Sequence, residues 1–238
     1  MSRQHQVIES KHNNTYKELL RIKQKGSATG YVLLEGERAL RQLEADGLDF
    51  ELFVRQGETI AGQVMNDHLF EKLCATKSPQ GVLMKLTIPP EKAFDEGPVL
   101  VLDRISDPGN LGTLLRTASA FGIQNILSLV GSVDVYNDKV LRSSLGAVLS
   151  LNIRQRASLD DLAALYRPLF LADFGGEDFY GLSYPENFAL VIGNEAHGVS
   201  PAIKELPSSV LTIPMVNAME SLNAAVAGAI LMQHMMRD

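Results

Sequence analysis

The second half of the chain alternates short apolar runs with polar or glycine-rich turns. The runs are Val99–Leu102, Ile126–Val130, Leu169–Ala172, Ala189–Ile192 and Val210–Ile213. Short, mostly apolar runs of this kind are typical of strands buried on both faces in a parallel sheet covered by helices. We therefore predict an α/β domain with a parallel sheet, whose ligand crevice lies beyond the carboxyl ends of the strands.

The first half has a different rhythm, in which amphipathic helical segments alternate with short β-prone runs. Helices are predicted over 8–22, 37–45 and 66–74, and strands over 31–34, 50–55 and 81–86. From Ile88 to Pro98 the chain carries prolines and charges without periodicity, which marks a domain boundary. We predict a small N-terminal α/β domain over 1–90, a linker over 91–98 and a second domain over 99–238.

Composition excludes several classes of protein. Hydrophobic residues make up 45% of the chain and charged residues 21%, which indicates a folded globular protein and not a disordered one. The single cysteine, Cys74, excludes an internal disulfide and a four-thiolate zinc site. No apolar stretch reaches the roughly 18–20 residues that span a bilayer, and the polar N-terminus lacks the apolar core of a signal peptide. These features predict a cytoplasmic protein.

The net charge of −6 hides an asymmetry along the chain. Residues 1–41 hold eight basic and four acidic side chains, a net of +4, which leaves 14 basic against 24 acidic side chains for the remainder, a net of −10. A basic arm on an acidic body indicates a local contact with a polyanion such as RNA, although a solvated helix face accounts for the charge equally well.

Three strand-to-turn junctions carry the candidate chemistry. The first follows Val99–Leu102 and runs from Asp103 to Arg116. Asn110 is the predicted N-cap of a helix whose apolar residues recur at helical spacing until Gly122. Arg116 falls opposite this apolar stripe, so it faces solvent or a pocket.

The second junction reads Gly193-Asn194-Glu195-Ala196-His197-Gly198 and follows a buried run. Its two glycines invite comparison with a phosphate-binding P-loop, but Val199 stands where that loop needs lysine, which excludes a nucleoside triphosphatase. Ser200 and Pro201 are a favourable helix start. Glu195 has no capping role in this pattern and is therefore a candidate site residue, whereas His197 is a weaker one.

The third junction contains Ile213-Pro214-Met215 and then Ser221-Leu222-Asn223. It opens into an apolar segment, 224–232, that is rich in small residues and is predicted to form a helix buried on several sides. Burial in the core and burial at a subunit interface both account for this composition.

Taken together, the three junctions resemble the motifs of the SpoU (TrmH-like) branch of the SPOUT RNA methyltransferases. The resemblance covers residues 99–235 and rests on Asn110-x-Gly112-x-x-x-Arg116, Gly193-Asn194-Glu195-x-x-Gly198, Ile213-Pro214-Met215 and Ser221-Leu222-Asn223. The N-terminal part is similar to the L30e-like substrate-binding domain of the family. The resemblance implies a homodimer with a deep C-terminal trefoil knot, which uses S-adenosylmethionine (AdoMet) to methylate a ribose 2′-hydroxyl of rRNA or tRNA.

The resemblance also assigns roles to individual residues. Those that would hold AdoMet, largely through backbone groups, are Gly193, Ile213 and Leu222. The catalytic cluster would comprise Arg116, Asn110, Glu195, Ser221 and Asn223, and no metal is required. Two roles are open to Arg116: proton acceptor, or clamp for a phosphate and a developing oxyanion, since a guanidinium stays protonated with a pKa above about 12. Glu195 would orient Arg116, while Ser221 and Asn223 would position the ribose or the loops.

The sequence departs from the family pattern at two positions. Asn217 stands where glycine is common and Ser27 where arginine is common. Asparagine tolerates a positive φ better than other side chains, so the loop around Asn217 is expected to keep its shape, whereas Ser27 alters the expected RNA contact. Two rival functions remain open, a non-catalytic RNA-binding or ribosome-assembly factor and a base-modifying enzyme of the same superfamily.

Overall fold

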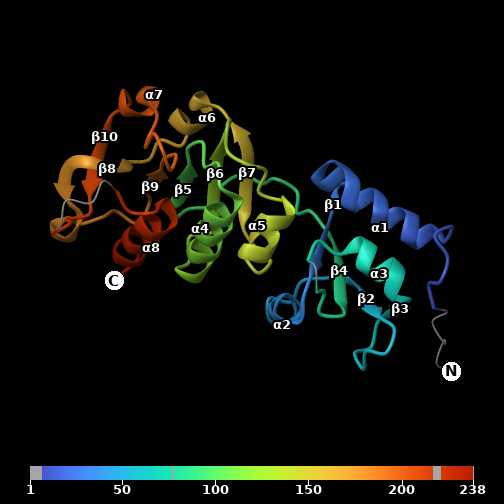
Figure 1. The fold of residues 1–238 in the computed structure, drawn as a ribbon. Helices are drawn as coiled ribbons and strands as arrows, with labels where there is room; N and C mark the ends of the chain where they lie inside the picture. The colour runs from blue at the N-terminus through green and yellow to red at the C-terminus, as the bar shows by residue number, and fades with distance from the viewer. Residues whose placement is uncertain (1–6, 77, 217–220, 238) are drawn as a thin grey trace. The chain divides into compact units, whose positions relative to one another are not determined.

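The chain folds into two compact units, each with its own sheet (Figure 1). A computed structural model describes residues 7–76, 78–216 and 221–237. The first unit comprises residues 1–89 together with 136–149, and the second comprises 90–135 with 150–238. Within the described residues, no helix combines the length and the apolar character needed to cross a membrane.

The first unit is built on a mixed four-stranded sheet in the order β1-β4-β2-β3. Its elements are α1 (Asn14–Lys25), η1 (Gly26–Thr29), β1 (Tyr31–Glu35), α2 (Glu37–Ala45), β2 (Glu51–Arg55), β3 (Gln63–Met65), α3 (Asp67–Leu73) and β4 (Val82–Thr87). Strand β4 runs antiparallel to β1 and β2, and β3 runs parallel to β2. Helices α1 and α3 pack with β2 and β4 around a core that includes Leu19, Phe53 and Phe70.

Two details of this unit differ from the sequence-based prediction. The first helix begins at Asn14 and not at Ile8, because the side chain of Asn13 accepts a hydrogen bond from the Tyr16 amide and caps the helix there. Ile8 instead forms an isolated parallel bridge with Met65 of β3. Strand β3 is only three residues long, so it left no alternating pattern to recognise.

A segment from the second half of the chain belongs to the first unit. Residues 136–149 form α5 (Asp138–Ser143) and η2 (Ala147–Leu149), and α5 packs against β1. A Cβ added at Gly146 would lie 3.0 and 3.1 Å from side-chain carbons of Leu34 and Leu43, so the backbone approaches the first unit closely. Nothing in the sequence indicated this placement, because packing partners distant in the chain leave no local pattern.

The second unit contains the predicted parallel sheet, which the structure confirms. All neighbouring strands run parallel in the order β10-β8-β9-β5-β6-β7. The strands are β5 (Val99–Leu102), β6 (Asn125–Leu129), β7 (Asn152–Ala157), β8 (Leu169–Asp178), β9 (Ala189–Ile192) and β10 (Ser208–Thr212), and the helical elements are α4 (Pro108–Ala120), α6 (Leu159–Ala163), η3 (Phe179–Gly181), α7 (Pro201–Lys204) and α8 (Ala224–Met235). Strand β7 was not predicted, because polar residues interrupt its apolar positions at the edge of the sheet.

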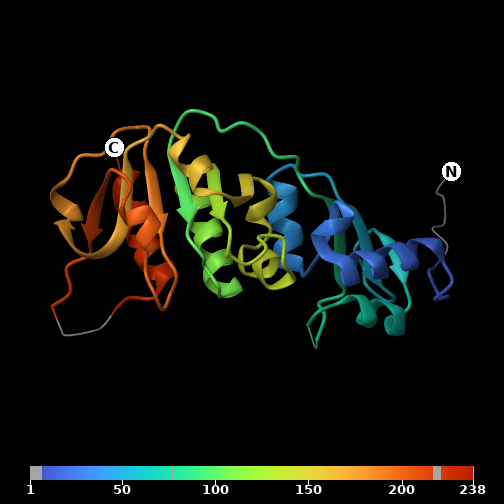
Figure 2. The same ribbon diagram turned by 90° about the horizontal axis from the view of Figure 1, so that it is seen from above.

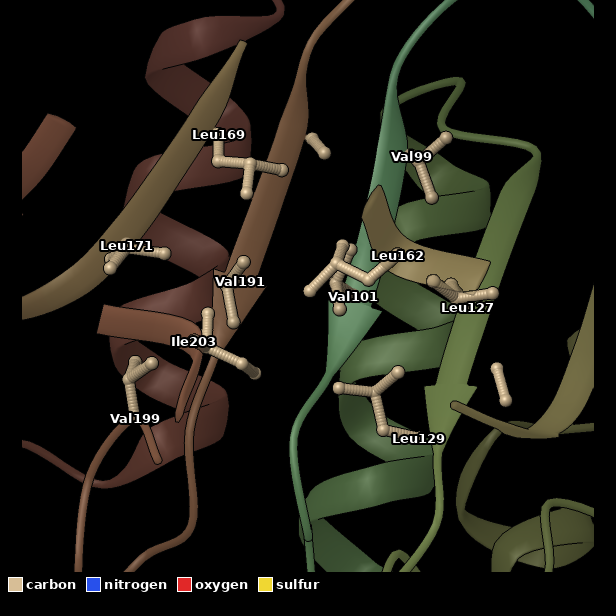
Figure 3. Close-up of a cluster of buried hydrophobic side chains, with 12 residues drawn as sticks. Val99, Val101, Leu127, Leu129, Leu162, Leu169, Leu171, Val191, Val199 and Ile203 are labelled. Atoms are coloured by element: carbon tan, nitrogen blue, oxygen red, sulfur yellow. The ribbon is translucent and has the colours of Figure 1, made fainter. Parts of the chain in front are cut away.

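Helices cover both faces of this sheet (Figure 2). On one face, Leu162 of α6 and Ile203 of α7 pack on Val101 and Val191 in a continuous buried cluster, drawn in Figure 3. Helices α4 and α8 of the same unit lie side by side (Figure 1). A Cβ added at Gly228 of α8 would lie 2.4 Å from a side-chain carbon of Leu114 in α4. The small residues of α8 thus let it approach α4 closely.

Candidate active site

A pocket of about 1170 Å³, part of it open to solvent, lies at the carboxyl ends of β9 and β10 and beside residues 172–174 of β8. This is the edge at which the parallel sheet was expected to bind a ligand. Five of the residues singled out from the sequence line it: Gly193, Glu195, Ile213, Ser221 and Leu222. The pocket therefore brings residues of the second and third junctions together, although they are 18 or more positions apart in the chain.

The loop after β9 is compact because its backbone folds onto itself. Asn194 and Gly198 exchange two backbone hydrogen bonds, of 3.0 and 2.8 Å, and the Asn194 side chain accepts from the amides of Ala196 and His197. A Cβ at Gly193 would lie 2.2 to 2.5 Å from backbone atoms of Gly198 and Val199. Glycine is thus required at 193 by packing alone, before any ligand is considered.

A buried acid and a strained arginine hold this loop from the neighbouring strand. Asp103, 2% exposed, accepts hydrogen bonds from the Ser200 amide (2.6 Å) and from Arg104 Nε (3.1 Å). Arg104 has a φ of +58°, donates to the Gly198 carbonyl, and offers its own carbonyl to the Asn194 side chain at 2.8 Å. A left-handed arginine costs energy and persists only where its surroundings fix it. Sequence analysis missed both residues.

Glu195 is held by the first junction. One carboxylate oxygen accepts from the Asp107 amide and from Asn110 Nδ2, and the other accepts from the amide and hydroxyl of Ser106, at 3.0 to 3.3 Å. Burial raises the pKa of Glu195, but the hydrogen bonds, led by the one from Asn110, outweigh burial and hold the pKa below its ordinary value. The carboxylate is therefore ionised at neutral pH and saturated with donors.

Asn110 and Asn223 extend this network to the last helix. Asn223 Nδ2 donates to Asn110 Oδ1 at 2.9 Å, and Asn223 Oδ1 caps α8 by accepting from the amides of Ala225 and Val226. The predicted N-cap at Asn110 is wrong: Asp107 caps α4, with Pro108 at its first position, and its side chain accepts from the Asn110 amide. Asn110 thus lies in the first turn, where its side chain is free to join Glu195 to Asn223.

Arg116 stands apart from these contacts. It is exposed on α4, as the apolar stripe predicted, and within the described residues it makes no hydrogen bond or ion pair. The contacts of Glu195 go to Ser106, Asp107 and Asn110 and not to Arg116. The arrangement leaves a permanently cationic side chain available to an external anion.

Two further polar residues of the pocket escaped sequence analysis. Asp173 follows the apolar run of β8 directly, and Thr212 ends β10; both line the pocket. A polar residue immediately after an apolar run is the sequence signal that could have drawn attention to Asp173. His197 lines the pocket as well and is exposed. Asn217, the position where glycine is common, lies outside the described residues.

Comparison with known proteins identifies the family. The model of the SpoU rRNA Methylase family matches residues 97–233. The chain is 32% identical to the 23S rRNA (guanosine(2553)-2′-O)-methyltransferase RlmP of Bacillus subtilis, over 96% of this chain and 98% of that protein. It is similar in structure to an RNA methyltransferase of the TrmH family from Porphyromonas gingivalis, with a TM-score of 0.80, 28% identity and coverage of 93% of this chain and 96% of the other.

A second solved structure shares the fold. The AdoMet-bound rRNA methyltransferase of Sinorhizobium meliloti superposes with a TM-score of 0.78 at 23% identity and covers 96% of both chains. The family match spans more than half of this chain and contains all three junctions. The chain therefore belongs to the SpoU rRNA methylase family of RNA 2′-O-methyltransferases, as its motifs predicted.

Proposed function

We propose that this protein transfers the methyl group of AdoMet to a ribose 2′-oxygen of ribosomal RNA. The observation that carries the proposal is the pocket at the carboxyl edge of the parallel sheet, which Gly193, Ile213 and Leu222 line together. Ribosomal RNA is favoured over tRNA because the B. subtilis relative, similar over almost the whole length of both chains, is a 23S rRNA enzyme.

The residues of the pocket suit the cofactor. Ile192, Leu211 and Leu231 offer apolar walls to a purine, and the backbone of the loop after β9 offers donors and acceptors to its edge. When bound, the cofactor supplies a methyl group activated by a sulfonium. Gly193, Ile213 and Leu222 would hold it.

Arg116 is the proposed catalytic residue. A ribose hydroxyl is a poor nucleophile, and negative charge develops on its oxygen as it attacks. A guanidinium is a poor base because it stays protonated. We therefore assign Arg116 to bind the adjacent phosphate and to stabilise the developing oxyanion, with the proton leaving to water.

The network of Glu195, Asn110 and Asn223 is assigned a positioning role. Its hydrogen bonds join the loop after β9, the start of α4 and the start of α8. Both oxygens of the Glu195 carboxylate already accept hydrogen bonds from the protein. We therefore assign Glu195 to hold these loops around the pocket and to fix the position of the first turn of α4, the helix that carries Arg116. Ser221, exposed at the pocket rim, is left to contact the ribose.

The first unit is the proposed RNA-docking module, corresponding to the L30e-like domain predicted over residues 1–90. Lys17, Arg21 and Lys25 follow one another at four-residue spacing on α1, and all three are exposed. Residues four apart lie on one face of a helix, so these three form a cationic stripe. A stripe of this kind suits a phosphate backbone.

A trefoil knot, a homodimer and a cytoplasmic location belong to the same proposal. The hydrogen bond from Asn223 to Asn110 brings the start of α8 to the first turn of α4, an arrangement that a threaded C-terminal segment would also produce. Val226 is 48% exposed on α8 and would be covered by a second copy. The buried, free thiol of Cys74 suits a reducing compartment.

The test is methyl transfer to ribosomal RNA taken from a strain that lacks the protein. Labelled AdoMet should label that RNA at a ribose, and Arg116→Ala should lower kcat by about 100-fold or more, the effect of removing one oxyanion-stabilising group, with AdoMet affinity unchanged. Arg156→Asn is the matched control, because it removes an exposed guanidinium of the same unit and asparagine tolerates its φ of +52°.

The rival functions give different results. A non-catalytic binding factor would bind AdoMet or RNA without labelling any RNA, and a base-modifying enzyme would place the label on a nucleobase. Full activity of Arg116→Ala would be consistent with ribose methylation but would show that Arg116 has no catalytic role.

A further inference from the structure

We propose that Asp173 binds the ribose hydroxyls of the cofactor's adenosine and so sets the specificity of the pocket for a ribonucleoside. The inference rests on the proposed function, because it assumes that AdoMet occupies this pocket. Asp173 lines the pocket beside Gly193 and Gly198, and its side chain is 15% exposed. It belongs to none of the three motifs by which the family was recognised.

A bulge in β8 directs Asp173 into the pocket. Strand β8 pairs with β9 up to Ala172, whereas its pairing with β10 jumps from Leu171 to Glu177, so residues 172–176 leave the ladder on that side. Two glycines allow the excursion: Gly175 has a φ of +74°, and a Cβ at Gly176 would lie 2.1 Å from the Val210 carbonyl oxygen. Bulges that redirect a side chain are enriched next to active sites.

Asp173 can still accept hydrogen bonds from a ligand, whereas both oxygens of Glu195, the other carboxylate of the pocket, already accept hydrogen bonds from the protein. Asp173 Oδ1 accepts one hydrogen bond, from the Phe174 amide at 2.8 Å. Oδ2 is buried and accepts no hydrogen bond among the described residues, although Lys204 Nζ lies 2.6 Å away outside the hydrogen-bonding direction. A buried acceptor without a donor calls for a ligand. Lys204 is about half exposed, so its ammonium can shift to make room for a ligand while it stays close to the carboxylate.

The charge around Asp173 selects hydroxyls over the α-ammonium group of the cofactor. Lys204 already places one ammonium against Oδ2, so a second cation there would be repelled. Neutral hydroxyls meet no such repulsion. In dinucleotide-binding folds, an acidic side chain likewise receives the ribose hydroxyls.

The experiment compares three ligands. Two share the ribose but differ in the amino-acid part, and the third lacks the ribose hydroxyls. S-adenosylhomocysteine and methylthioadenosine are titrated calorimetrically into wild type, Asp173→Asn and Asp173→Ala, together with the 2′,3′-dideoxy form of S-adenosylhomocysteine. We expect both Asp173 variants to bind S-adenosylhomocysteine and methylthioadenosine about 10-fold or more weakly, the effect of losing hydrogen bonds to a charged group. The wild type should lose a similar factor for the dideoxy ligand, to which the variants are indifferent.

Two controls separate ligand binding from a structural role. Glu177→Gln removes an exposed carboxylate of the same strand, and Lys204→Met removes the ion pair but keeps the carboxylate; both should still distinguish the ribose from the dideoxyribose. A loss confined to S-adenosylhomocysteine assigns Asp173 to the α-ammonium and overturns the inference, as does an equal loss for the dideoxy ligand. A wild type that binds no S-adenosylhomocysteine overturns the proposed cofactor as well.

Discussion

The four-stranded sheet of the first unit and the six-stranded sheet of the second differ in where their loops lead. In the first, β4 runs antiparallel to both neighbours, so the connecting loops leave from opposite edges. In the second, all strands run parallel, so the loops after β5, β8, β9 and β10 leave from one edge. Convergent loops bring distant side chains together, and this is where the pocket and the Glu195 network lie.

The two units also use charge differently. The core of the first unit contains Lys85, 7% exposed, which is neutralised by Glu18 and Glu51 at 2.6 and 2.8 Å and stacked over the Tyr31 ring. Other cations of this unit, among them Lys17, Arg21 and Lys25, are exposed on helix α1. In the second unit, charged side chains fix loops around one pocket. In the second unit, the functional charged side chains are gathered at one pocket, so single substitutions there should have large effects. In the first unit, the exposed cations are spread over the surface, so single substitutions should have small effects that add up.

The largest effect is expected at Gly193. In Gly193→Ala the new methyl group would meet backbone atoms at 2.2 to 2.5 Å, and the backbone cannot yield as a side-chain end does. Overpacking costs about 1–3 kcal/mol or more, enough to weaken AdoMet binding up to about 100-fold. Calorimetric titration with AdoMet measures the loss of affinity. Gly181→Ala is the matched control, since a Cβ there meets no atom of the described residues within 4 Å. Equal affinities in the two variants would contradict the account of the loop.

Glu195→Gln should have the next largest effect, and one that depends on pH. Hydrogen-bond donors surround both oxygens of Glu195, so the NH₂ group of a glutamine would face a donor whichever way the amide turned. We expect this to lower the free energy of unfolding by about 1–3 kcal/mol. The folded-state pKa of Glu195 lies below its ordinary value. Its stabilising contribution is therefore complete above the unfolded pKa of about 4.3 and is lost as the pH falls through the lower folded-state pKa.

Thermal melts of the wild type and Glu195→Gln between pH 3 and 8, roughly the span around that pKa, test this prediction. The gap in Tm should be constant near neutrality and close at the acidic end. Glu186→Gln changes an exposed carboxylate of the same unit that makes no hydrogen bond within the described residues, so its gap should be near zero throughout. A gap for Glu195→Gln that grows toward acid would show that the carboxylate does not act through its charge.

Neutralising the stripe on α1 should have a graded effect on RNA binding. Replacing Lys17, Arg21 and Lys25 by glutamine removes three exposed cations without touching the core. If each contacts a phosphate, the slope of log affinity against log salt should become shallower by about two to three units. AdoMet affinity should not change. Lys92→Gln, an exposed cation of the second unit, should leave the slope unaltered, and an unchanged slope in the triple variant would remove α1 from the RNA-binding surface.

The same contrast explains how much was predictable from sequence. In the second unit, buried strands and the turns after them are local patterns, so the parallel sheet and the residues converging on its edge followed from Val99–Leu102, Ala189–Ile192 and their neighbours. In the first unit, most helices and strands were recognised, but β3 was too short and the partners of residues 136–149 too distant in the chain. Local patterns do not report such packing.

Within the site, sequence failed where conformation and not residue type decides. Asn110 was predicted as the N-cap, but Pro108 favours the first helical position, which moves the cap to Asp107. The left-handed backbone of Arg104 has no sequence signature, so its grip on the loop after β9 was missed. Asp173 was missed although it directly follows an apolar run, because only the bulge with its two glycines turns the side chain into the pocket.

The smallest effect concerns Cys74 and tests whether the first unit holds reactive chemistry at all. Burial, reinforced by the nearby Glu35 carboxylate, raises the pKa of the Cys74 thiol to about 12, and the side chain is 6% exposed. At pH 8 about one thiol in ten thousand is then ionised, so Ellman's reagent should react only as the unit opens. Ala75→Cys places an exposed thiol beside it, which should react at once while Cys74 stays protected. Rapid labelling of wild-type Cys74 would mean that the core around Glu35 opens readily, and the contrast between a chemically quiet first unit and a reactive second one would not hold.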